Sequence, residues 1–465
     1  MPLILGTNSV KDTGFDVANS CRFNDDDSAY MHKTPGGAGN RRKFTISAWV
    51  KRGQVTTNSF IFSAWTADND AGHFAFGFES AERLTVDTYS TNLLTTNRVF
   101  RDPSAWYHVV CAIDTENDTA NNRVRLYVNG VEETSFATRN NPTEDVDLQA
   151  NNAVIQAVGT NYYNSQGNVF YDGYMAEFCM IDNQQLTPTS FGEFDDSGIW
   201  KPIDVSGLTF GTNGFYLDFE ASGNLGNDAN GGTDFTEVSL AATDQTTDTC
   251  TNNFATLNAI GNVYGHTYSG TFSNGNLSYA TSGRESIAFG TMETVSSSSN
   301  GFYFEIKCGT LDSNRTYIGL IDPSYSSTNS NGGLQNFNEK AVINSSGEYF
   351  NTANGTSVVA TYTSFSANDI IMVAYKNGSI WFGKNGTWMN SGNPSTAANA
   401  IDTNINTDRT WLPSIGYNSA FDANFGSPPF AISSGNTDGN GYGNFEYAVP
   451  SSYYSLNTKN LAEYG

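Results

Sequence analysis

Apolar and polar residues alternate along most of the chain with a period of two. In FTISAWVK (residues 44–51) the even positions are apolar and fall on one side of an extended strand, and the odd positions, which include Trp49, fall on the other. The segment HVVCAI (108–113) is continuously apolar, which is typical of an inner strand between two packed sheets. No apolar stripe with helical spacing extends over three turns. The pattern therefore predicts an all-β protein built from β-sandwiches.

Two distant stretches end a strand on an Asn-Gly pair. They are RVRLYVNGVEE (123–133) and GSIWFGKNGTW (378–388). Asn-Gly readily takes the positive φ angles of the two-residue turn that joins antiparallel strands. We therefore predict tight hairpins at 129–130, 377–378 and 385–386, in two separate β-sandwiches.

Four segments of the first part follow one another in a familiar order: FTISAWVKRG, WYHVVCAID, RVRLYVNGVEE and VFYDGYMAEFCMIDNQQLTPTSFGEF. This series resembles the laminin-G/concanavalin-like jelly roll over about residues 15–200, and we assign that fold to 1–205. In the second part GFYFEIKC, TYIGLID, the double Asn-Gly segment and ANFGSPPF resemble the SPRY (B30.2) domain. This resemblance covers about 263–450 and implies a SPRY-like β-sandwich over 263–465.

The segment between the two sandwiches, 206–262, is rich in Gly, Asn, Asp and Thr. One interpretation is a flexible linker. However, GFYLDFE alternates, with Phe215, Leu217 and Phe219 on one face. We therefore expect an irregular connector that begins with an edge strand docked on a sandwich.

The amino-acid composition limits the kinds of partner that we expect the protein to bind. The formal net charge is −24, and no basic face for phosphate contacts is apparent, so we expect no nucleic-acid binding. There is no run of 18 apolar residues, and MPLILGTNS has no charged region of a signal peptide. We expect synthesis in a cytoplasm without membrane insertion. The five cysteines form no C-x-x-C pair and are expected to be small buried thiols.

No catalytic set is apparent in the sequence. None of the four histidines accompanies a G-x-S-x-G elbow, there is no H-E-x-x-H motif, and His108 is expected to be structural. Some concanavalin-like relatives are glycosidases, which need two carboxyl groups close together. The candidates here are Asp172 and Glu177, but a spacing of five puts them on opposite sides of a regular strand. We therefore expect no catalytic residues and no enzymatic activity.

Two kinds of binding residue stand out in the predicted loops. ADNDAGH (67–73) could supply Asp68 and Asp70 as oxygen ligands for Ca²⁺, although acidic loops are often simply solvated. We expect no other cofactor. Exposed aromatic rings can cover the C–H face of a sugar, and the candidates are Trp65, Tyr162 and Tyr163 beside Asn and Asp acceptors. The alternative is that these rings pack against a neighbouring sheet or subunit.

A third resemblance covers nearly the whole chain. It rests on NSCRFNDDDSAYMHKTPGGAGNRRKFTISAWVKRG, IDNQQLTPTSFGEFDDSGIWKP and TDQTTDTCTNNFATLN, which look like a family of tailed-bacteriophage virion proteins. The resemblance implies a non-enzymatic structural protein of the virion, a tail fibre or appendage that binds a host-surface glycan or protein receptor. It also implies other virion proteins as partners and a homo-oligomer, for which we expect a trimer. The alternatives are a capsid decoration or head-fibre protein, or a polysaccharide depolymerase.

Overall fold

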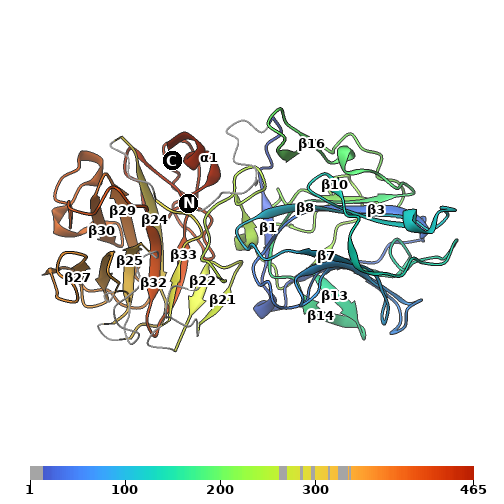
Figure 1. The fold of residues 1–465 in the computed structure, drawn as a ribbon, viewed down its shortest axis with the longest axis horizontal. Coiled ribbons are helices and arrows are strands. Elements are labelled where there is room, and N and C mark those ends of the chain that lie inside the picture. The colour runs from blue at the N-terminus through green and yellow to red at the C-terminus, as the bar shows by residue number, and fades with distance from the viewer. Residues whose placement is uncertain are drawn as a thin grey trace. The chain divides into compact units, whose positions relative to one another are not determined.

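The chain forms two compact units, Met1–Asn253 and Phe254–Gly465. The regular secondary structure of both units consists almost entirely of β-strands, as predicted (Figure 1). The segment MPLILGTNS lies outside the residues that the computed structural model describes. The described residues are 14–260, 270–282, 286–294, 299–312, 315–322, 334 and 337–464.

The first unit is a sandwich of two antiparallel sheets. The first sheet has the strand order β10-β9-β8-β3-β15-β1-β20, and β18 also pairs with β15. Its strands are β1 (Ser20–Phe23), β3 (Lys43–Arg52), β8 (Trp106–Asp114), β9 (Val124–Val128), β10 (Val131–Glu132), β15 (Gly173–Asp182), β18 (Phe215–Leu217) and β20 (Gln245–Thr246).

The second sheet has the strand order β11-β7-β6-β5-β4-β12-β2-β19. Its strands are β2 (Tyr30–Lys33), β4 (Ser59–Trp65), β5 (His73–Phe78), β6 (Arg83–Asp87), β7 (Asn92–Val99), β11 (Phe136–Arg139), β12 (Ile155–Val158) and β19 (Thr236–Val238). Two small hairpins add β13 (Thr160–Tyr163) with β14 (Gln166–Phe170), and β16 (Gly192–Phe194) with β17 (Trp200–Pro202).

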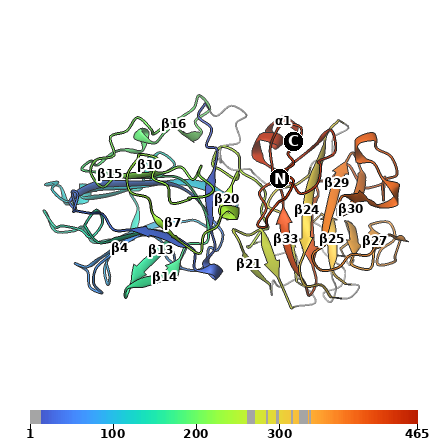
Figure 2. The ribbon, with the colours of Figure 1, turned by 180° about the vertical axis from the view of Figure 1, so that it is seen from behind.

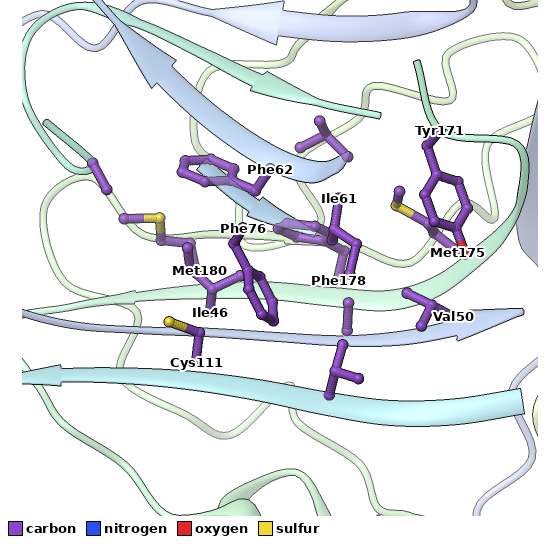
Figure 3. Close-up of a cluster of buried hydrophobic side chains, with 14 of the residues drawn as sticks. Ile46, Val50, Ile61, Phe62, Phe76, Cys111, Tyr171, Met175, Phe178 and Met180 are labelled. Carbon is purple, nitrogen blue, oxygen red and sulfur yellow. The ribbon is translucent and has the colours of Figure 1, made fainter. Parts of the chain in front are cut away.

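The core of this sandwich lies between the two sheets. Figure 3 shows Ile46 and Val50 from β3 and Phe178 from β15 in the same cluster as Phe62 and Phe76 from the second sheet. The even positions of FTISAWVK therefore point inward, as the alternation predicts. The odd positions are buried as well, because further chain segments cover the outer face of the first sheet.

His108 lies in this covered layer and has a structural role, as expected. Its Nε2 is 2.8 Å from Ser47 Oγ, and its Nδ1 accepts a hydrogen bond from Trp200 Nε1 at 3.1 Å. Burial lowers the pKa of His108 to about 3, so the ring stays neutral. The neutral ring links β3 and β8 to the β16–β17 hairpin.

The connector belongs to the first unit as far as Asn253. The predicted edge strand is present as β18, and Phe215, Leu217 and Phe219 all enter the core. Farther along, Asp248 accepts a hydrogen bond from Lys51 Nζ at 2.8 Å, with both side chains only 1% exposed. The boundary between the two compact units lies at 253/254, within the segment 206–262 that the sequence assigns to the connector.

The second unit is also a two-sheet sandwich (Figure 2). One sheet runs β21-β22-β33-β24-β29-β30-β31, with β34 parallel to β24, and the other runs β23-β32-β25-β26-β27-β28. The bounds are β21 (Thr271–Ser273), β22 (Ser278–Ala280), β23 (Ile287–Phe289), β24 (Gly301–Cys308), β25 (Tyr317–Ile321), β26 (Lys340–Asn344), β27 (Glu348–Asn351), β28 (Ala360–Thr361), β29 (Ile370–Lys376), β30 (Ser379–Lys384), β31 (Thr387–Trp388), β32 (Leu412–Gly416), β33 (Ala420–Asn424) and β34 (Tyr453–Tyr454).

The three Asn-Gly turns are confirmed. Asn129 and Gly130 have φ angles of 47° and 80°, and the flanking Val128 and Val131 pair directly, so the turn holds two residues with positive φ. The pairs at 377–378 and 385–386 have the same geometry.

Little helix accompanies these strands. In the described part of the chain the α-helical segment is α1 (Thr458–Tyr464), and a 3₁₀ turn at Pro188–Ser190 falls within TPTSFGEF. No helix among the described residues is long and apolar enough to cross a membrane. All five cysteines are buried free thiols, as expected.

Candidate functional site

A cleft of about 430 Å³ opens on the outer face of the second sheet of the first unit. The alternation in β5 and β6 produces this face: Phe74, Phe76 and Val86 enter the core, so His73 and Asp87 point the other way. Asp87 pairs directly with Ala75 on β5, two residues from His73 on the same face. The lining residues are His73, Asp87, Thr88, Tyr89, Ser90, Asn92, Asn161 and Tyr163.

One wall of the cleft is the β13–β14 hairpin. Its turn uses Asn164 and Ser165, both with positive φ, and Tyr163 pairs with Gln166. Figures 1 and 2 show this hairpin beside the second sheet, on the side away from β3 and β8. Aromatic contacts hold it there, because the ring of Tyr162 lies 6.4 Å from the ring of Tyr30 on β2.

The structure brings the three predicted aromatic residues together around this hairpin. The rings of Trp65 and Tyr162 are 5.9 Å apart, and Tyr163 lines the cleft. All three side chains are half-buried. Tyr89 on the opposite rim is 47% exposed and was not identified from the sequence. The cleft therefore lies between aromatic side chains from the β6–β7 turn and from the hairpin.

The two predicted calcium ligands hold loops at the edge of the cleft. Asp68 Oδ1 accepts hydrogen bonds from Trp65 Nε1 at 2.7 Å and from the Asn164 backbone at 3.0 Å, so it ties the hairpin tip to β4. Asp70 accepts from the backbone and hydroxyl of Ser90, at 2.6 Å and 2.9 Å, and from Thr91. Led by the Ser90 backbone bond, these hydrogen bonds lower the pKa of Asp70 to about 2.

These contacts position the rim of the cleft without assembling a metal centre in the described part of the chain. No group of three or more His, Cys, Asp or Glu side chains that could hold a metal ion occurs among the described residues. Asp68 and Asp70 accept hydrogen bonds from different donors. Calcium binding by these two residues stays a prediction.

The sequence did not indicate two polar residues that line the cleft, His73 and Asp87. His73 is 3% exposed, and its Nε2 lies 2.7 Å from Asn161 Oδ1, while its Nδ1 has no hydrogen-bond partner. Burial lowers the pKa of His73, so the ring is neutral. Asp87 accepts a hydrogen bond from Thr85 Oγ1 at 2.6 Å, and burial raises its pKa to about 7. The alternation of HFAFGF and RLTVD was the signal that could have placed both residues on this face.

The two carboxyl groups weighed as a glycosidase pair do not meet in the cleft. Asp172 lies just before β15 and accepts a hydrogen bond from the Gln54 backbone at 2.8 Å. Glu177 lies in a β-bulge with φ 50° and accepts from Tyr216 OH at 2.6 Å. Five residues of extended chain span roughly 16 Å at about 3.3 Å per residue. The two catalytic carboxyl groups of glycosidases lie roughly 5 to 9.5 Å apart, which is much closer than this span.

A family model matches part of the first sandwich. Residues 25–191 match the model of the concanavalin A-like lectin/glucanases superfamily, so this unit has a concanavalin A-like sandwich fold, as the sequence predicted. A search of curated proteins gives no match.

Several solved structures resemble parts of the chain. A putative carbohydrate binding protein from Bacteroides ovatus is 15% identical, with 48% of this chain and 58% of that chain covered and a TM-score of 0.33. A heptameric SAP-like pentraxin from Limulus polyphemus is 15% identical, with 37% and 80% covered and a TM-score of 0.29. The SPRY domain of human HERC1 is 15% identical, with 32% and 87% covered and a TM-score of 0.24.

Proposed function

We propose that this protein is a non-enzymatic carbohydrate-binding protein that recognises a glycan through the cleft between β5, β6 and the β13–β14 hairpin. One observation carries the proposal: the same cleft combines aromatic side chains on its rim with a buried His73 nitrogen that lacks a partner. A buried polar atom without a partner costs free energy, and a ligand hydroxyl would remove that cost.

The chemistry of the cleft suits a sugar. Tyr89 and Tyr163 offer flat apolar surfaces for the C–H face of a ring, while His73, Asp87 and Asn161 offer hydrogen-bonding groups. A volume of about 430 Å³ is within the usual range for small-ligand sites. The concanavalin A-like lectin fold of this unit supports the same conclusion.

The finer part of the proposal concerns where the protein acts. We infer from the resemblance to tailed-phage virion proteins that the chain is a structural component of a virion, a tail fibre or appendage, and that the glycan is on the host surface. Other virion proteins and further copies of the chain would be its partners. Imaging of labelled protein on particles tests this location. Label on the capsid surface instead of the tail would favour the decoration alternative.

The assembly proposal has its own measurement. We expect a homotrimer, so light scattering of purified protein at micromolar concentration should give three times the chain mass. A monomer mass under these conditions, and again at tenfold higher concentration, would contradict the trimer.

Glycan binding is tested with an array of bacterial surface glycans. Wild-type protein should bind a defined subset, and the Tyr89→Ala/Tyr163→Ala variant should lose at least ten-fold in affinity because both rim rings are removed. Phe194→Ala is the matched control, since Phe194 is 51% exposed on the same unit but does not line the cleft. Equal loss in the control, or no binding by folded wild-type protein, would contradict the proposal.

A further inference from the structure

The polar groups in the cleft differ in what they can offer a ligand. His73 Nε2 faces Asn161 Oδ1 at 2.7 Å. A carbonyl oxygen accepts hydrogen bonds, so Nε2 carries the proton of the neutral ring. Nδ1 is then an acceptor, and it has no partner although His73 is 3% exposed. A ligand that reaches this nitrogen must present a donor to it.

Asp87 supplies a second acceptor on the same face. It pairs across the sheet with Ala75, and diagonal neighbours two residues apart lie about 7 Å from each other, so Asp87 is close to His73. Its carboxyl group accepts from Thr85 Oγ1 at 2.6 Å, and no cation is among the described groups that shift its pKa. One ligand could therefore contact both acceptors.

The electrostatic surroundings of Asp87 are negative. Glu79 from the β5–β6 turn acts on Asp87 through its charge, and the titratable residues that line the cleft with Asp87 are His73, Tyr89 and Tyr163. Asp68 and Asp70 at the cleft edge add negative charge beside His73. No lysine or arginine lines the cleft in the described part of the chain. Burial and the charge of Glu79 raise the pKa of Asp87 to about 7. A ligand cation would lower the pKa of Asp87 again, because it would pair with the carboxylate charge that burial otherwise leaves uncompensated.

We propose that the cleft selects a sugar that carries a protonated amine, with Asp87 receiving the ammonium group and His73 Nδ1 accepting from a neighbouring hydroxyl or from the same group. This inference rests on the proposed glycan-binding function and narrows it to one class of ligand. A sugar carboxylate is disfavoured, since it would place a second negative charge beside Asp87 and an acceptor against His73 Nδ1. At long range the net charge of −24 also attracts a cationic ligand and repels an anionic one.

The test is isothermal titration calorimetry on the full chain at pH 7. The probes are D-glucosamine, D-galactosamine and D-mannosamine, each beside its N-acetyl derivative, its parent hexose and its uronic acid. We expect at least one amine to bind ten-fold or more tighter than its N-acetyl and parent forms, and no detectable binding of the uronic acids. Repeating the titration in buffers of different ionisation enthalpy should show proton release as Asp87 ionises.

Two variants separate the role of charge from that of shape. Asp87→Asn keeps the size of the side chain and should bring the affinity for the amine down to that of the parent hexose. Asp204→Asn is the control, because Asp204 is exposed on the same unit and does not line the cleft. Parent hexoses that bind as tightly as the amines, with no change in Asp87→Asn, would overturn the amine selectivity and leave glycan binding standing. Folded wild-type protein that binds neither these sugars nor any glycan on the array would overturn the proposed function and this inference with it.

Discussion

The rings of Trp65 and Tyr162 lie 5.9 Å apart, although the two residues belong to strands from distant parts of the chain. Trp65 ends β4, and Tyr162 lies on the β13–β14 hairpin that packs against the same sheet. Asp68 fixes the arrangement, because it accepts bonds from both Trp65 Nε1 and the Asn164 backbone. The wall of the cleft therefore depends on the position of one hairpin.

Removal of the hairpin aromatics should weaken recognition without unfolding the domain. The Tyr162→Ala/Tyr163→Ala variant loses the contact with Trp65 and one side of the cleft, but both side chains are only half-buried. Under the virion role proposed above, particles that carry this variant should adsorb to host cells at least ten-fold more slowly, while the melting temperature of the purified protein changes by only a few degrees. Normal adsorption would show that the hairpin is not the recognition surface, and loosened particles would favour the decoration alternative.

Two of the Asn-Gly turns should differ in their sensitivity to a β-branched residue. Gly130 has φ 80°, and a Cβ there would lie 2.3 Å from the Trp200 ring, whereas at Gly386 (φ 83°) the nearest atom is 3.0 Å away on Tyr447. Gly386→Val should cost about 1–3 kcal/mol of unfolding free energy from backbone strain, and Gly130→Val should cost more. Urea unfolding measures both. Gly207→Val is the control, since a Cβ at Gly207 would have no atom within 4 Å. Equal effects in all three variants would contradict the turn geometry.

A buried ion pair fastens the end of the first unit. Lys51 and Asp248 are each 1% exposed, and Asp248 also accepts from Trp106 Nε1 at 3.1 Å. Lys51→Met should cost about 3–5 kcal/mol, because it leaves a buried carboxylate without its cation. Lys43→Met breaks an ion pair at a 31% exposed side chain and should cost under about 1 kcal/mol. Denaturant unfolding followed by tryptophan fluorescence compares them, and similar costs would contradict the structural role assigned to Asp248.

Much of the fold was predictable because it depends on local patterns. The alternation in FTISAWVK places Ile46 and Val50 in the core, and the Asn-Gly pairs specify their own turns. The end of the first unit was not predictable, because the bond between Lys51 and Asp248 joins residues 197 positions apart. Composition alone made this part of the chain look like a connector.

The candidate site was predictable only in part, for the same reason. Aromatic residues in polar loops indicated Trp65, Tyr162 and Tyr163, and the structure places Tyr163 in the cleft. The sequence did not single out His73 and Asp87, because each occupies an ordinary outward-facing position of a strand. Their proximity follows from the register of β5 with β6, and His73 is buried beside Asn161 of the neighbouring hairpin.

Glu177 should make stability depend on pH. Burial raises its pKa from 4.5 to about 7, so the folded state keeps a proton that the unfolded state loses. The free energy of unfolding therefore falls as pH rises from about 4.5 to about 7. Glu177→Gln can still accept from Tyr216 but does not titrate, so its stability relative to wild type should rise by about 3 kcal/mol over this range. Urea unfolding at pH 5 and pH 8 tests this, with exposed Glu193→Gln as control. A pH-independent difference would show that Glu177 is ionised in the folded state.

A crystal structure of the full chain with its tightest-binding glycan tests the central claim most directly. We expect the sugar to lie in the cleft of the first unit, with a ring against Tyr89 or Tyr163 and a donor on His73 Nδ1. A sugar bound instead in the second unit, for example in the 240 Å³ cavity beside Asp402 and Trp411, would contradict it.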